Sequence, residues 1–286
     1  MTNIATTNNP VFPWTIRFFS GGRTEDQAVD IVKEEPLALE VNARQVALLM
    51  RAPGAEEELG VGFCLSEGII GNFEAIRSVH LCAGESMASG NNNGKADAPR
   101  NLVEIWADLP AVHLDNGASV VRMIRSGCGS VDMAQVSLSL PQISGHLELS
   151  VQQLFAMSRT MRSSQQTYRR TRGIHAAGVF DRRGHLQIIH EDIGRHNAVD
   201  KVIGHCLLQD IPLSDKAIVC TGRASHEMVS KAARLNVPLL ASFSTPTSLA
   251  VQLADAVGLT LVGYLRGHQM NVYTHPQRIV PGSALP

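Results

Sequence analysis

The chain has 286 residues, of which 44% are hydrophobic and 18% charged, so it can form one large globular domain or two modest ones. Its formal net charge of −1 provides no basic field for nucleic acid or for an anionic membrane surface. No run of residues approaches the roughly 20 apolar positions of a membrane span, and residues 1–10 lack the apolar core of a secretory signal. We therefore expect a cytoplasmic protein.

The first half of the chain has a mixed pattern. Residues 36–46 have extended character, residues 56–68 have helical spacing with Gly68 as the C-terminal cap, and residues 102–106 form a strand pattern. Residues 84–101 are rich in Gly, Asn, Ser and Ala and are expected to form a surface loop. We assign residues 1–145 to a smaller N-terminal α+β domain.

The second half, residues 146–286, predicts an α/β domain. A helix is expected over 149–167, followed by a β-hairpin with strands 173–180 and 185–190. Asp192 is placed to cap a helix whose apolar stripe includes Val199, Val202, Ile203, Cys206 and Leu207. Strands 217–220, 238–243 and 259–265 then alternate with helices 225–235 and 248–257, which is typical of a parallel or mixed sheet flanked by helices.

The loops after these three strands are candidates for a ligand site, because open α/β sheets bind ligands at the carboxyl ends of their strands. Arg223 and Arg266 supply positive charge, and Ser225, Thr247 and Ser248 suit helix N-termini, where backbone N–H groups attract anions. A phosphate-bearing ligand is the resulting hypothesis. The alternative is that the hydroxyl residues only cap helices and the arginines only cover the surface.

A second candidate is the charged segment 190–196, HEDIGRH, between the hairpin and the next helix. It contains His190, Asp192, Arg195 and His196, and His175 lies on the neighbouring strand. Charge at this density in a turn is more often functional than structural. The spacing matches no standard metal-ligand pattern, so we assign no metal site.

The five cysteines are widely spaced and include no C-x-x-C pair, so we expect free thiols in a reducing compartment. Cys206 and Cys220 lie on apolar stripes, Cys64 lies inside a predicted helix, and Cys82 adjoins the predicted loop. Cys128 differs from these, because glycines flank it and Arg122 and Arg125 are near in sequence. This setting favours a reactive thiolate, although a glycine-flanked loop cysteine can also be incidental.

Eight segments carry a resemblance to a known family: 59–70 (LGVGFCLSEGII), 126–129 (SGCG), 173–177 (GIHAA), 190–201 (HEDIGRHNAVDK), 222–229 (GRASHEMV), 246–251 (PTSLAV), 259–267 (LTLVGYLRG) and 272–278 (VYTHPQR). Through them the chain resembles the FdhD family, the accessory sulfurtransferases of formate dehydrogenase, from about residue 35 to residue 278. The family often has a second cysteine three residues after the first, and Val131 stands at that position here, followed by Asp132.

The resemblance implies that a cysteine desulfurase loads sulfur onto Cys128 as a persulfide. The protein would then pass the sulfur to the molybdenum bis-guanine-dinucleotide cofactor, which makes formate dehydrogenase active; a guanine nucleotide is expected to bind in the cofactor's place. It also implies a cytidine-deaminase-like main domain and a homodimer. The expected cofactor-binding residues are Tyr264, Leu265, Arg266, Gly267, His268 and Gln269, together with His175, Asp192, Arg195, His196, Arg223 and Ser225.

Two other functions are open at this point. One is a chaperone that binds the molybdenum cofactor for formate dehydrogenase without moving sulfur. The other is a zinc deaminase, which needs an H-x-E triplet and a P-C-x-x-C motif; residues 146–148 supply the triplet, but the cysteine motif does not occur. A classical nucleotide enzyme is disfavoured because the sequence has no P-loop and no G-x-G-x-x-G.

Overall fold

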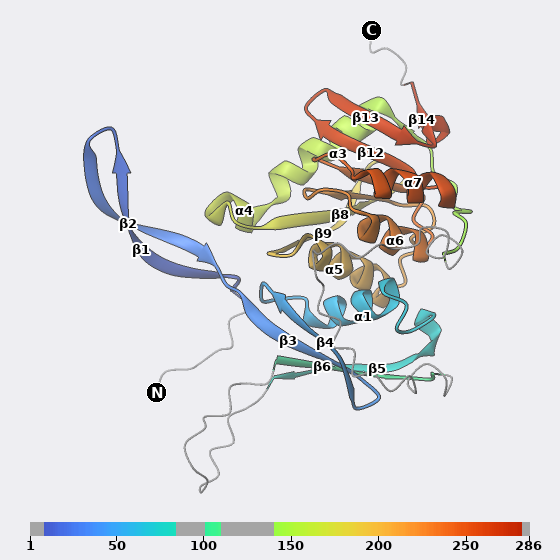
Figure 1. Cartoon of the computed structure of the whole chain (residues 1–286), viewed down its shortest axis with the longest axis horizontal. Helices are drawn as coiled ribbons and strands as arrows, with labels where there is room; N and C mark the ends of the chain where they lie inside the picture. Colours follow the sequence, from blue (N-terminus) through green and yellow to red (C-terminus); the bar gives the residue numbers. More distant parts are fainter. Residues whose placement is uncertain (1–8, 84–100, 110–139, 282–286) are drawn as a thin grey trace, which may run out of the picture.

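The computed structural model describes residues 9–83, 101–109 and 140–281 (Figure 1). Its main part is a six-stranded mixed sheet in the order β13-β12-β11-β10-β8-β9. Strands β10, β11 and β12 are parallel, as predicted, and β8, β9 and β13 run antiparallel to their neighbours. The bounds are β8 His175–Phe180, β9 Leu186–Asp192, β10 Ala217–Cys220, β11 Leu239–Ser242, β12 Thr260–Arg266 and β13 Gln269–Thr274.

Helices cover both faces of this sheet because its central strands are apolar on both sides. On β10, Ile218 and Cys220 face one core while Ala217 and Val219 face the other. The first core is closed by α5 Arg195–Leu208, α6 His226–Arg234 and α7 Ser248–Val257, and the second by α3 Val151–Ser164. The predicted mixed α/β sheet flanked by helices is therefore confirmed, while the likeness to cytidine deaminase stays a prediction.

A second, four-stranded sheet lies below α5 in Figure 1 and has the order β4-β3-β6-β5. One helix, α1 Glu56–Ser66, covers it and packs against α5 on its other side. Gly68 follows that helix in the left-handed conformation, which agrees with its predicted capping position. The strands are β3 Glu35–Val41, β4 Arg44–Arg51, β5 Ile76–Ala83 and β6 Asn101–Ala107. The division of the chain at residue 145 remains a prediction.

The helix predicted over 149–167 is wrong in its extent. Residues Leu149–Ser150 form the short strand β7, paired with β14 Ile279–Val280, and Ser150 caps α3. The helix stops at Gln165, whose ψ of 90° is not helical and whose side chain donates to the Met161 carbonyl. A separate short helix, α4 Gln166–Thr171, then begins.

A long hairpin that the sequence patterns did not predict is formed by β1 Val11–Ser20 and β2 Arg23–Val32, and it extends away from the body of the molecule (Figure 1). Several large apolar side chains on it remain exposed, including Trp14 at 56% and Phe19 at 71%. Arg170 of α4 donates to the Asp30 carboxylate of β2 and connects the hairpin to the body. No helix in the described part of the chain is long and apolar enough to cross a bilayer.

Candidate functional site

One edge of the six-stranded sheet brings the predicted loops together. The parallel strands β10, β11 and β12 end there, and β8 begins there, since Ala177 pairs with Cys220. Directly after β10, the Thr221 hydroxyl accepts a hydrogen bond from the Ala176 N–H at 3.0 Å and lies 3.3 Å from Nδ1 of His175. The expectation that the loops after these strands share one edge is therefore confirmed.

A cavity of about 540 Å³ opens at this edge. Three arginines line it: Arg162 from α3, Arg172 after α4, and Arg266 at the end of β12. His175 and Thr221 also line it, and none of the described lining residues is a carboxylate. A cavity with this charge and this size suits an anionic ligand as large as a nucleotide.

Aromatic rings hold the arginines of the cavity in place. The guanidinium of Arg162 lies 5.2 Å from the centre of the Phe243 ring, and that of Arg172 lies 5.4 Å from the Tyr168 ring. Arg266 donates through Nε to the Phe243 carbonyl at 2.9 Å, which leaves the other guanidinium nitrogens for a ligand. Phe243 and Tyr168 also give the cavity two flat apolar surfaces.

The break between α3 and α4 shapes the cavity. The Glu191 carboxylate accepts hydrogen bonds from the Thr167 and Tyr168 N–H groups, both at 2.8 Å, and so holds the start of α4. This turn brings Tyr168 and Arg172 to the same cavity as Arg162. Sequence reasoning missed all three, because an unbroken helix over 149–167 would not turn back toward the sheet edge.

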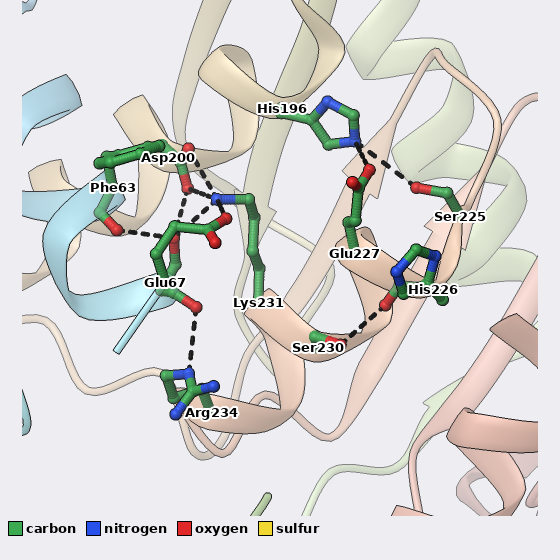
Figure 2. Close-up of polar contacts among 11 residues, drawn as sticks. Phe63, Glu67, His196, Asp200, Ser225, His226, Glu227, Ser230, Lys231 and Arg234 are labelled. Carbon is green, nitrogen blue, oxygen red and sulfur yellow. Dashed lines mark hydrogen bonds and ion pairs between the residues drawn. The ribbon is translucent and has the colours of Figure 1, made fainter. Parts of the chain in front are cut away.

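His196 lies next to this site and is oriented by α6 (Figure 2). Its Nε2 lies 2.9 Å from the Glu227 carboxylate and 3.5 Å from the Ser225 hydroxyl. The hydrogen bond with His196 lowers the pKa of Glu227, despite partial burial, so this carboxylate is charged at neutral pH. Burial lowers the pKa of His175, and the positive charge of Arg195 lowers it further.

A buried charge network holds α6 one helical turn beyond Glu227, at Lys231 (Figure 2). The Lys231 ammonium contacts both carboxylate oxygens of Asp200 at 2.9 and 3.0 Å, the Ser66 hydroxyl at 2.9 Å and the Glu67 carboxylate at 2.6 Å. Burial alone would lower the pKa of Lys231, but the charges of Asp200 and Glu67 outweigh it and raise that pKa. The network connects α1, α5 and α6, and therefore helps to hold Glu227 against His196.

Several predicted site residues have structural roles instead. Asp192 is completely buried, does not line the cavity, and accepts from Lys201, Asn197 and the N–H groups of Ala52 and Gly194. It does not cap α5 as predicted, because the N-cap residue is Gly194 and no side chain caps that end.

Of the remaining predicted residues, Arg195 packs against Gly222, leaving no room for a side chain there, while Arg223 is exposed. Ser225 begins α6, but its side chain makes no capping bond. In the segment 264–269, Leu265 is buried in the sheet core and cannot contact a ligand. The other five, Tyr264, Arg266, Gly267, His268 and Gln269, are exposed. The Arg266 guanidinium lies over the Tyr264 ring, His268 is edge-on to Phe155, and Gln269 pairs with Arg266 across the strands.

Cys128 lies in residues 110–139, outside the described residues. Cys64, Cys206 and Cys220 are buried, and burial raises the pKa of each thiol to about 12. Slight burial and Glu104 raise the pKa of Cys82. The expected structural roles of Cys206 and Cys220 agree with this burial, and none of the four described thiols is set up as a nucleophile.

Comparisons with known proteins agree with the resemblance. Residues 32–280 match the model of the FdhD/NarQ family. The sulfur carrier protein FdhD of Mycobacterium tuberculosis is 38% identical over 271 residues, covering 92% of this chain and 96% of that protein. The protein of the same name from Streptomyces coelicolor is 35% identical over 262 residues, covering 89% and 90%. The crystal structure of a protein described as a formate dehydrogenase accessory protein, from Desulfotalea psychrophila, matches with a TM-score of 0.75 at 27% identity, covering 95% of this chain and 100% of that one.

Proposed function

This chain belongs to the FdhD/NarQ family, and on that premise we propose that it is a sulfur carrier needed for active formate dehydrogenase. Sulfur is carried as a persulfide on Cys128 and delivered to the molybdenum bis-guanine-dinucleotide cofactor. The observation that supports delivery to this cofactor is the arginine-lined cavity at the carboxyl edge of the sheet, which has no carboxylate among its described lining residues.

Loading is an exchange between sulfur atoms. The Cys128 thiolate attacks the terminal sulfur of a persulfide on a cysteine desulfurase and forms a new S–S bond. The S–S bond in the desulfurase breaks, and its cysteine leaves as a thiolate, so no external oxidant is required. This chemistry requires one accessible thiolate. The raised pKa values of the four described cysteines disfavour a thiolate at any of those four positions.

The cofactor is cargo in this proposal, and its guanine nucleotide arms carry the groups that the cavity suits. Phosphates fit the guanidinium groups of Arg172 and Arg266, and a purine ring fits against Phe243 or Tyr168. Delivery passes a neutral sulfur atom from Cys128 to the metal, which supplies the two electrons that convert it to sulfide, and the Cys128 thiolate is regenerated. A homodimer would offer one such cavity for each of the two nucleotide arms.

The loading step is tested by mass spectrometry of the intact protein after incubation with a desulfurase and free cysteine. We expect added sulfur, removable by a reductant, that maps to Cys128 and is lost in Cys128→Ala but kept in the matched variant Cys82→Ala. Sulfur that appears equally on Cys128→Ala would contradict the assignment. If the wild-type protein takes up no sulfur but binds guanine nucleotide, the chaperone function is favoured instead.

Cofactor binding is tested with GDP as the probe in titration calorimetry. Arg172→Ala and Arg266→Ala should each weaken binding by about tenfold or more, because a hydrogen bond to a charged group contributes roughly 1.5–3 kcal/mol. Arg182→Ala is the matched control, since that arginine is exposed and pairs with Asp215 away from the cavity. Equal weakening in all three variants would indicate nonspecific charge effects and would contradict a site in this cavity.

A further inference from the structure

Three metal-ligating side chains meet where α1, α5 and β9 pack together. They are Glu58 in the first turn of α1, His190 on β9 and His205 in the last turn of α5. One ligand atom from each lies within 4.8 Å of the other two. Nδ1 of His205 is 3.9 Å from the Glu58 carboxylate, and the two imidazole rings lie edge to face with centres 5.7 Å apart.

His190 gives an independent indication of a ligand. Its Nε2 is buried and has no hydrogen-bond partner among the described residues. A buried polar atom without a partner costs free energy, so such atoms are rare unless a bound water or ion satisfies them. The other two side chains, at 28% exposed for Glu58 and 24% for His205, leave a path from solvent to the group.

The backbone around this cluster is held closely. α1 and α5 cross at Gly62 and Gly204, where neither helix has space for a Cβ atom. A Cβ on Gly204 would lie 1.8 Å from the Glu58 carbonyl, so Glu58 sits directly against the residue that precedes His205. Close contact between the helices therefore fixes the backbone positions of two of the three ligands, Glu58 and His205, before any ion binds.

We propose that Glu58, His190 and His205 bind a divalent transition metal ion of the zinc type. Two imidazoles and a carboxylate are a common zinc ligand set, and three protein ligands leave one position for water. Bond lengths of about 2.0–2.2 Å would place the ligand atoms about 3.4 Å apart, so small side-chain rotations are enough. The positive charge of Lys201 near His190 opposes the binding of a cation. That charge is paired with the Asp192 carboxylate, which lies 2.7 Å from the Lys201 ammonium.

The ion would join parts of the chain that are distant in sequence. α1 belongs to the core of the four-stranded sheet, whereas β9 and α5 belong to the six-stranded sheet. β9 continues into Glu191, which holds α4, and α5 begins at Arg195 and His196 beside the cavity. Metal binding at this place would therefore fasten the four-stranded layer to the strand and helix that frame the candidate site. The proposed metal site is independent of the proposed sulfur transfer.

The test is binding of Zn²⁺ to the full-length protein after chelator treatment, with Co²⁺ as a spectroscopic probe. Cys128→Ala is the parent, so that the proposed reactive thiol cannot contribute. We expect one ion per chain, a cobalt spectrum of nitrogen and oxygen ligands without thiolate charge-transfer bands, and a Tm raised by zinc. His205→Ala and Glu58→Gln should each weaken zinc binding by at least about tenfold. Substituting a residue that only supports a metal ligand already lowers metal affinity by roughly 10–100-fold, so the loss of a ligand itself should cost no less.

The matched control is His185→Ala, an exposed histidine on the hairpin turn whose side chain is 71% exposed. It should bind zinc as the parent does. The proposal is overturned if the parent binds no zinc at micromolar concentrations, if His205→Ala and Glu58→Gln bind as tightly as the parent, or if thiolate bands dominate the cobalt spectrum. His205→Gln replaces His205→Ala if the alanine variant does not fold.

Discussion

The crossing of α1 and α5 depends on two glycines, and replacing either with alanine tests how closely the two layers are joined. A Cβ on Gly62 would lie 1.8 Å from the Asp200 carbonyl oxygen, and a Cβ on Gly204 would lie 1.8 Å from that of Glu58. Real Cβ atoms essentially never approach closer than 3.0 Å, so the helices must separate by at least 3.0 − 1.8 = 1.2 Å. The obstacle is backbone and cannot rotate away.

The expected loss follows from that separation. Extra volume in a packed interior costs about 1–3 kcal/mol and occasionally more, and a backbone obstacle belongs at the upper end of this range. Alanine is a better helix former than glycine by about 1 kcal/mol, which offsets part of the cost. We therefore expect Gly62→Ala and Gly204→Ala each to lower the free energy of unfolding by about 2 kcal/mol.

Urea denaturation measures this loss, with Gly71→Ala as the matched control because a Cβ there meets nothing within 4 Å. The control should change stability by less than about 0.5 kcal/mol. The double variant Gly62→Ala/Gly204→Ala should lose less than the sum of the two single variants, because one separation relieves both clashes. Wild-type stability in the single variants, or strict additivity in the double variant, would refute the close crossing.

Three further predictions concern stability. Lys231→Met should cost about 3–5 kcal/mol in urea denaturation, because it leaves the Asp200 carboxylate buried without its cation, and Lys231→Met/Asp200→Leu should recover most of the loss. Ser150→Ala should cost about 1 kcal/mol by the same measurement, because it removes the capping box with Gln153 at the start of α3; an unchanged midpoint would argue against the cap. The lowered pKa of His175 means that the unfolded chain takes up a proton more readily than the folded protein does. The contribution of His175 to stability is therefore complete above the unfolded pKa of about 6.5 and is lost as the pH drops toward the folded pKa. His175→Asn should flatten that decline, and a pH profile identical to that of the wild-type protein would contradict the prediction.

The sheet edge could be predicted from sequence because local patterns specify it. The strand over 217–220 matches β10 in full, since four consecutive apolar residues buried on both faces leave little ambiguity. The helix predicted over 248–257 matches α7, which has Thr247 as its N-cap and Gly258 at its end. Strands and helices in alternation then require the loops with Thr221 and Arg266 to lie at one edge.

The β1–β2 hairpin could not be predicted in the same way. A strand is recognised by apolar residues that alternate toward a core, and this hairpin has no core beneath most of its length. Phe18 and Phe19 are adjacent and both exposed, so the alternation that marks a strand is absent. Cross-strand pairs such as Arg17 with Asp26 stabilise it locally and leave no periodic signal in the sequence.

In the segment 190–201, charged residues have structural roles that the sequence pattern did not indicate. Its charges predicted ligand contacts, yet Glu191 holds the start of α4 and Asp192 holds the backbone of Ala52 from the four-stranded layer. Sequence spacing cannot reveal these partners, which lie more than 20 residues away along the chain. Because α4 and the residue after it bring Tyr168 and Arg172 into the cavity, a substitution at Glu191 should alter ligand binding by moving those two residues. The segment therefore affects the site through the packing it maintains, and its effect on ligand affinity should be accompanied by a change in the stability of α4.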